Sequence, residues 1–360
     1  MRTVQLPFYV RLPLVLASIV LICYILSEVS IIFIPLTFAL FFAILLYPLA
    51  RFFEEKLRFN KGASALVSVL LFVSLLGGFL YFFIEQFISF SNDFPRLKSR
   101  FEEIFNDIQH WISSKMHITS HQQSDYINRA ASSIVETTAY SLRSVFYSIT
   151  TVVLLTIFII LFTFFLLYHR RLLKKFVLHL FSEQHRDKVN EIISETKSMI
   201  NSYILALMVE MVLVSIVNCS MFLIMGIQYA FLLGIMAAVM NIIPYIGIYT
   251  SIVIAFLVTF ANSSGGMAVE VAIGLFCVHL IDSNMLMPRL VGGRVKMNPF
   301  ITIIAVMFGE FLWGVAGMFL FIPIIGIIKL ICERVEGLEA WGILIGVEEK
   351  PEKKVKIKKN

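Results

Sequence analysis

Charged residues are scarce in this chain, and the scarcity limits the kind of protein it can be. Asp, Glu, Lys and Arg make up 15% of the 360 residues, whereas hydrophobic residues make up 59%. A typical soluble domain has about 25% charged and about 45–50% apolar residues. The composition therefore excludes an ordinary water-soluble domain, and it indicates a protein surrounded largely by lipid.

The chain also lacks the short motifs of common enzymes. It contains no H-E-x-x-H, G-x-S-x-G, P-loop or C-x-x-C sequence, and its few cysteines are far apart in or beside apolar segments, at Cys23, Cys219, Cys277 and Cys332. Such spacing fits neither a zinc site nor a disulfide framework. We therefore predict no catalytic residue, no metal and no cofactor, so the chain is not expected to be an enzyme or an ATP-driven pump.

Acidic residues are outnumbered by basic ones, 24 to 30, and the cations have a distinctive placement. They cluster at the ends of apolar runs, as in Arg170-Arg171, Lys174-Lys175 and a Lys-rich tail. This placement is typical of the cytoplasmic side of membrane proteins rather than of a nucleic-acid-binding face. We predict no nucleic-acid partner and a cytoplasmic basic tail at residues 336–360.

Long apolar runs are what the chain has in abundance. A bilayer core of roughly 30 Å requires about 20 apolar residues per helix. In the first half such runs occur at residues 12–26, 31–49, 62–84 and 150–168, and they are too long for barrel strands. We predict an all-α polytopic integral membrane protein with about eight transmembrane helices. Helices 1–3 fall within residues 1–89, the first two as a tight hairpin, and helix 4 falls within residues 149–168.

Two polar stretches interrupt the apolar runs of the first half. Residues 90–148 are predicted to be an extracytoplasmic helical segment, either a packing cap or a gating or subunit-contact element. Asp93 and Pro95 predict where its helix starts. Residues 169–198 are predicted to be a cytoplasmic basic amphipathic linker. Its apolar stripe could lie at the membrane interface, held by anionic lipid.

Residues 199–335 are predicted to form a C-terminal transport core with broken or re-entrant helices. Five apolar pieces lie between two cytoplasmic ends, at residues 200–225, 227–243, 245–260, 271–281 and 300–331. An odd number of full crossings cannot join two ends on one side, so at least one piece must be interrupted. Exposed backbone at membrane depth is tolerated where it faces protein or a cavity, and transporters build their sites there. The predicted breaks are Pro244, Gly247, Pro288, Gly292, Gly293 and Pro323.

Polar residues inside these apolar pieces are the candidates for a solute or ion path. A charge at a helix centre costs roughly 2.5–3.5 kcal/mol even on a lenient scale, so such residues usually face a cavity or a partner. The candidates are Asp282, Asn284, Asn241, Glu210, Glu310, Arg289 and Arg294. For Glu210 and Glu310 the alternative is local satisfaction or protonation, and for Asp282 it is an ion pair with Arg289 or Arg294. His279 is expected to be neutral and satisfied by a helix carbonyl.

Three stretches carry a resemblance to a known family. They are Asn241-Ile-Ile-Pro-Tyr-Ile-Gly247, Asp282-Ser-Asn-Met-Leu-Met-Pro288 with Gly292-Gly293, and Trp313-Gly-Val-Ala-Gly-Met-Phe-Leu-Phe-Ile-Pro323. Together they resemble the AI-2E (autoinducer-2 exporter) family of bacterial membrane transporters, also called PerM-like permeases. Two positions depart from that pattern, since many members have Pro where this chain has Ile248 and a small residue where it has Glu310.

The resemblance implies a secondary transporter that crosses the bacterial cytoplasmic (inner) membrane several times and forms a homo-oligomer. Some family members are associated with autoinducer-2 export and others with sodium/proton antiport. The first hypothesis is export of a small polar solute such as autoinducer-2 or a related metabolite. The second is antiport of Na⁺ or another cation against H⁺ by the intramembrane carboxylates, and the third is a non-transporting membrane scaffold. Membrane lipid is the remaining expected partner.

Overall fold

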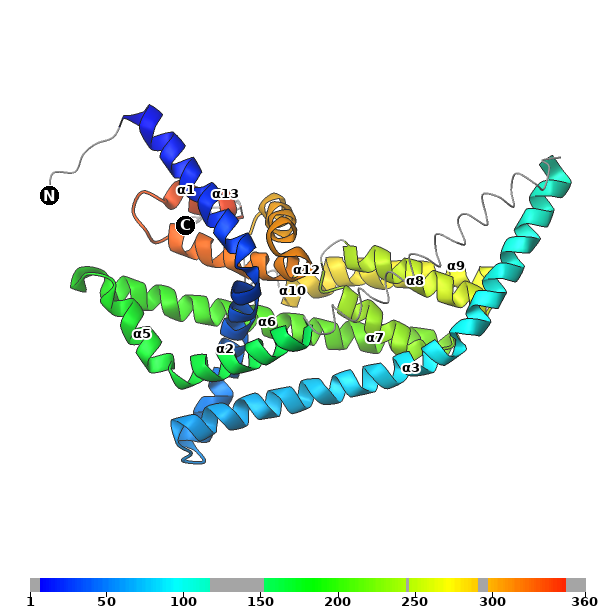
Figure 1. Ribbon diagram of the computed structural model, residues 1–360, viewed down its shortest axis with the longest axis horizontal. Helices are drawn as coiled ribbons and strands as arrows, with labels where there is room; N and C mark the ends of the chain where they lie inside the picture. The colour runs from blue at the N-terminus through cyan, green and yellow to red at the C-terminus, as the bar shows by residue number, and fades with distance from the viewer. Residues whose placement is uncertain (1–6, 117–151, 244–245, 291–296, 348–360) are drawn as a thin grey trace, which may run out of the picture. The chain divides into compact units, whose positions relative to one another are not determined.

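The computed structural model describes residues 7–116, 152–243, 246–290 and 297–347 (Figure 1). Predictions that concern residues 117–151, Pro244, residues 291–296 or the tail beyond residue 347 lie outside the described residues. Within those ranges every named element is helical, and the β contacts are limited to one isolated bridge between Met297 and Gly346. The predicted all-α class is confirmed.

Judged by length and composition alone, without regard to bends, several helices qualify as membrane spans. In the described part of the chain there are five, namely Ser30–Glu55, Lys61–Phe90, Glu183–Ile224, Gly265–Leu286 and Pro299–Cys332. A sixth is added if Val152–Tyr168 and Arg170–His179 count as one span. Shorter apolar helices occupy Leu12–Glu28, Ala230–Met240 and Gly247–Phe260. The chain is therefore a polytopic membrane protein.

The chain forms two compact units, each assembled from separate stretches of sequence. Unit 1 contains residues 1–45, 169–209 and 285–360, and unit 2 contains residues 46–168 and 210–284. This grouping in space does not test the six predicted sequence segments. It does place the three polar residues Glu210, Asn241 and Asp282 in the same unit.

Two predictions for the N-terminal helices were wrong. Helix α1 (Phe8–Glu28) and helix α2 (Ser30–Glu55) are separated by Val29 alone, and helical hydrogen bonds join Ile25, Val29 and Phe33 across that residue. The chain therefore does not turn back there in a tight hairpin (Figure 1). Helix α3 runs without a break from Lys61 to Met116, so no new helix starts at Asp93.

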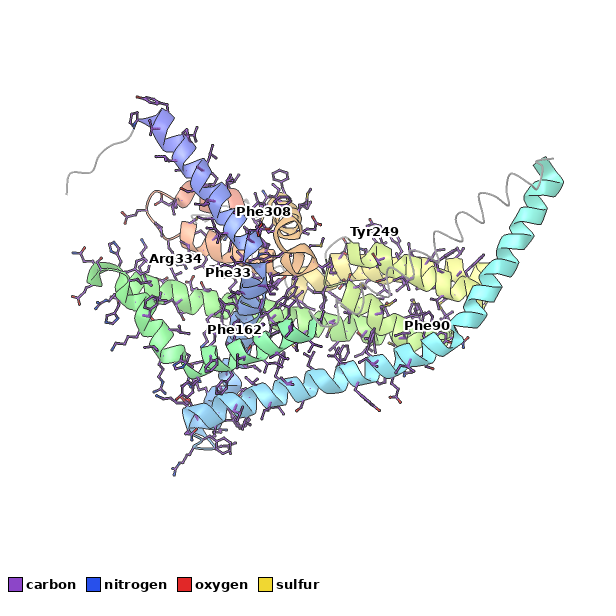
Figure 2. The ribbon with its side chains drawn as sticks, viewed as in Figure 1. Phe33, Phe90, Phe162, Tyr249, Phe308 and Arg334 are labelled. Atoms are coloured by element: carbon purple, nitrogen blue, oxygen red, sulfur yellow. The ribbon has the colours of Figure 1, made fainter. Side chains whose placement is uncertain are left out.

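Unit 2 is built around a bundle of short apolar helices. Its elements include α3, the second part of α6 (Arg186–Ile224), α7 (Ala230–Met240), α8 (Ile246–Asn262) and α9 (Gly265–Ile281). Helix α8 contacts both α7 and α9, and α3 contacts α7 and α8. The core is made of Phe222, Leu233, Ala255, Val271 and Leu275. Phe90 of α3 packs edge to face on Tyr229, with ring centroids 5.3 Å apart (Figure 2).

Unit 1 has a separate aromatic and aliphatic core. Phe41, Ile200, Tyr203, Ile204, Ala206 and Leu320 are buried together. Phe38 of α2 stacks on Phe319 of α12 (Pro299–Cys332), with ring centroids 5.9 Å apart. At the end of α12, Arg334 forms ion pairs with Glu191 and Glu195 of α6 (Figure 2). The last helix, α13 (Glu339–Ile345), packs on α12.

Helix α12 is a hairpin of two helical limbs rather than one apolar rod. Its backbone leaves helical geometry at Trp313 and at Gly314, where φ is 59° and ψ is −143°. A Cβ atom on Gly309 would overlap the carbonyl of Gly317, and the reverse holds for Gly317. Residues eight apart can touch in this way only if the chain folds back. The limb before Trp313 is about 21 Å long at 1.5 Å per residue, shorter than a bilayer core.

The hairpin revises the predicted positions of the chain breaks. Residues 300–331 were treated as one apolar piece, and the break inside them was placed at Pro323. The structure corrects this, because Pro323 lies within the second limb, which stays helical through it. The bend instead falls on Gly314, whose positive φ is readily adopted by a residue without a Cβ atom. The hairpin has the geometry expected of a re-entrant segment.

The contact between Gly309 and Gly317 makes a prediction about stability. Gly317→Ala should lower the free energy of unfolding by about 1–3 kcal/mol or more, because the added methyl group would push the two limbs apart. Gly77→Ala is the matched control, since Gly77 lies on α3 with open space around it. Thermal unfolding of the two purified variants in detergent measures the difference. Equal melting temperatures would show that the limbs are not held at this contact.

Candidate functional site

Three of the predicted path residues meet in unit 2. Glu210 comes from α6, Asn241 from the end of α7, and Asp282 from the end of α9. The Asn241 amide Nδ2 donates to Asp282 Oδ2 over 2.7 Å. The carboxyl group of Glu210 is close enough to that of Asp282 for the two to interact directly. Glu210 is 6% exposed and Asp282 is 2% exposed.

A break in the backbone positions Asn241. Helix α7 ends at Met240, and α8 starts a few residues later at Ile246. A Cβ atom on Gly247 would overlap the Met240 carbonyl, so the start of α8 passes directly against the end of α7. Only glycine fits such a close approach, and Gly247 lies in the first turn of α8 rather than in the break itself. The amide of Asn241 is thereby held at the end of α7, where it reaches α9.

A second irregularity positions Asp282. It begins a stretch of π-helix, Asp282–Leu286, that follows α9. A π-turn widens the helix, frees one carbonyl from its usual partner, and is often found at functional sites. Asn284, another predicted path residue, is exposed and donates from Nδ2 to the Leu280 carbonyl over 2.7 Å. Asn284 therefore completes the hydrogen bonding of its own helix.

A small cavity lies beside these residues, and Asn241 and Asp282 are part of its lining. Its walls include Val214, Asn218, Asn241, Leu275, His279 and Asp282. It is about the size needed for one water molecule. Glu210 Oε2, Asn218 Oδ1 and Asp282 Oδ1 are buried at or beside it with no hydrogen-bond partner in the protein. A buried acceptor without a partner lowers the stability of the fold by about 1–3 kcal/mol. A proton, a water molecule or a cation bound to these three oxygens would remove that cost.

Two lining residues were not predicted as part of the site. Asn218 lies two helical turns after Glu210, so a search for polar residues on the same face of α6 would have found it. His279 was expected to bond a helix carbonyl, but its Nε2 lies 3.2 Å from the Ser283 hydroxyl. It is one turn before Asp282 and lines the same cavity. That spacing on α9 was the available signal.

The other predicted path residues are not part of this cavity. Glu310 on α12 and Arg289 on α10 (Met287–Leu290) are exposed side chains of unit 1. Within the described ranges Asp282 has no ion pair, and Arg294 lies outside them. Those ranges also contain no group of three or more His, Cys, Asp or Glu residues that would hold a metal ion.

Asp282 was predicted either to line the path or to form an ion pair with an arginine. These two roles predict different stabilities for the Asp282→Asn variant. Asp282→Asn should change the free energy of unfolding by no more than about 1 kcal/mol, because a carboxamide oxygen still accepts from Asn241. Loss of a partner from a buried ion pair would instead cost about 3–5 kcal/mol. Thermal unfolding of the purified variant decides between them. Glu270→Gln is the control, since Glu270 is an exposed carboxyl on the same helix.

Comparison with known proteins assigns the chain to a family. The model of the AI-2E family transporters matches residues 14–337. YrrI of Bacillus subtilis (strain 168), a protein whose name assigns it to transport, is 24% identical over 308 residues, covering 83% of this chain and 85% of YrrI. The AI-2 transport protein TqsA of Escherichia coli (strain K12) is 24% identical over 134 residues, or 37% of this chain and 39% of TqsA. The chain belongs to the AI-2E family of transporters.

Proposed function

We propose that this protein is a secondary transporter of the bacterial cytoplasmic membrane that exports a small polar solute through a path containing the unit 2 cavity. The observation that carries the proposal is the set of three buried, unpaired oxygens of Glu210, Asn218 and Asp282. They come from two helices, and a third helix contributes Asn241. A site kept only for stability would be filled by apolar side chains, which need no partner. A non-transporting scaffold has no use for such a site.

The adjacent carboxyl groups favour coupling of transport to an ion. Like charges held close together in a low-dielectric interior repel strongly, so Glu210 and Asp282 cannot both be ionised unless something neutralises them. Among the described residues the cavity lining supplies no lysine or arginine. A proton or a small cation is therefore the natural neutralising partner. Binding and release of that partner would change the charge of the path in each transport cycle.

The solute is proposed from the family rather than from the cavity. TqsA, which aligns with about a third of this chain, is named an AI-2 transport protein. Autoinducer-2 is accordingly the first solute to test. The polar groups of the cavity lining are one carboxyl group, two amides and an imidazole, and they suit a polar molecule or its coupling ion better than an apolar one.

Direct exchange of a cation for protons is a second candidate, favoured by the chemistry of the unpaired oxygens. Carboxylate and amide oxygens are the ligands that hard cations such as Na⁺ prefer, and the carboxylates can also take up protons. In this mechanism no organic solute is required. The cation and the proton would compete for Glu210 and Asp282.

Transport by purified protein in proteoliposomes tests both candidates. We expect labelled autoinducer-2 to move in response to a pH gradient. We expect Glu210→Gln and Asp282→Asn each to slow that movement by about tenfold or more, equivalent to about 1.4 kcal/mol of barrier. Glu270→Gln should transport normally, because its carboxyl is exposed and away from the cavity.

The same vesicles distinguish the alternatives. An internal pH-sensitive dye reports whether protons leave the vesicles when Na⁺ is added without any solute. Such proton release would support cation/proton antiport instead of solute export. Full activity in both cavity variants would remove the cavity from the path. Folded protein that moves neither autoinducer-2 nor ions would favour the scaffold.

A further inference from the structure

Helix α5 (Arg170–His179) exposes a large apolar face that no described residue of unit 1 covers. Leu172, Phe176 and Leu180 lie four residues apart, on one side of the helix and its end, and they are 61%, 60% and 64% exposed. No residue of α5 is buried. Large apolar side chains at this spacing normally face a core or a partner. Among the described residues, none buries these three side chains.

The opposite face of α5 is strongly basic. Arg170, Arg171, Lys174 and Lys175 lie within six consecutive residues. No aspartate or glutamate occurs in the sequence between residues 152 and 182. Some cations elsewhere in the chain have an acid one helical turn away, as in the pairs Arg51–Glu55 and Lys329–Glu333. Lys174 and Lys175 therefore have no acidic residue close by in sequence, so an anionic partner or solvent must balance their charges.

The position of α5 along the chain identifies that partner. The apolar helix Val152–Tyr168 ends two residues before α5 begins, and the backbone at His169 (φ −90°, ψ 9°) separates the two helices. A helix that directly follows a membrane span starts at the membrane surface. It is about 15 Å long, too short and too charged to cross the bilayer itself. Its two faces match the two layers found there, an acyl boundary and a layer of headgroups.

We propose that α5 is an interfacial helix that binds the anionic phospholipid of the cytoplasmic leaflet. Its apolar face, Leu172, Phe176 and Leu180, enters the acyl boundary, while Lys174 and Lys175 bind headgroup phosphates together with the two arginines. Amphipathic helices rich in Lys and Arg lie at such surfaces with their apolar face buried, and each cation adds electrostatic attraction. The ligand is therefore an anionic diacyl lipid, recognised by its phosphate and its acyl chains together.

The test uses the full-length protein with a polarity-sensitive fluorophore on a cysteine replacing Phe176, after replacement of the four native cysteines by alanine. The protein is reconstituted in phosphatidylcholine vesicles with increasing phosphatidylglycerol. We expect the fluorophore to enter an apolar environment as phosphatidylglycerol rises, and to leave it at high salt because salt screens the headgroup charges.

A charge-removing variant and its control complete the test. Lys174→Gln combined with Lys175→Gln should lower the ratio of docked to undocked helix by about 30-fold, since each cation near an anionic surface contributes about fivefold. Lys353→Gln combined with Lys354→Gln removes the same charge from the tail and should leave docking unchanged.

Two results would overturn the proposal. The first is a fluorophore environment that is the same at every phosphatidylglycerol content. The second is an apolar environment that depends on protein density in the vesicle and not on lipid charge, which would make the face a contact between copies of the chain. Folding of the double variant is checked by its thermal unfolding. The salt dependence of the labelled protein that keeps Lys174 and Lys175 tests the same proposal without the double variant.

Discussion

The hydrogen bond from Asn241 to Asp282 joins two helices at the points where each departs from regular geometry. Helix α7 stops beside Asn241, and α9 changes to a π-helix at Asp282. A 2.7 Å bond between these residues fixes both irregular ends with one contact. In lipid, an amide or a carboxylate without a partner costs several kcal/mol, so the arrangement depends on this bond and on whatever satisfies the remaining oxygens.

Because Asn241 and Asp282 must meet and find partners inside the membrane, the surroundings of the cavity are tightly packed but not apolar throughout. Gly247 lets the start of α8 press on the end of α7, and Gly234 lets α7 approach Cys219 of α6. Small residues at helix contacts are how membrane bundles bring backbones together. Close packing leaves space for about one water molecule between the helices. The polar groups around Asp282 therefore come from several helices, and none of them can move far without disturbing its own helix.

The sequence alone predicted the fold class and some residues of the candidate site, for reasons that differ between residues. Glu210 and Asp282 were identified because a carboxyl group in an apolar run has few reasons to be there except a partner or a cavity. Asn241 was identified by its place beside a proline and a glycine. Asn218 and His279 were missed because an amide or a neutral imidazole is easily satisfied inside a helix, so neither residue type signals a site without the neighbouring helices. Glu310 has the same chemistry as Glu210 but lies exposed in the other unit, which no local pattern reveals.

The hairpin in α12 is a backbone feature that local sequence patterns also did not predict. Its second limb contains a proline that does not break it, while the turn falls on a Trp-Gly pair between two glycines that touch. Proline marks a local preference, whereas the turn is fixed by a contact between residues on separate limbs. The sequence alone does not reveal that two glycines on separate limbs are in contact.

The indole of Trp313 at the tip of that hairpin donates from Nε1 to the Leu26 carbonyl over 2.9 Å and packs against Phe321. The emission of an indole depends on its hydrogen bonding and on the polarity around it. Trp341, by contrast, is largely exposed. Trp313 is therefore an intrinsic fluorescent probe of the hairpin tip. If the tip separates from α1 during transport, the tryptophan emission shifts without any added dye.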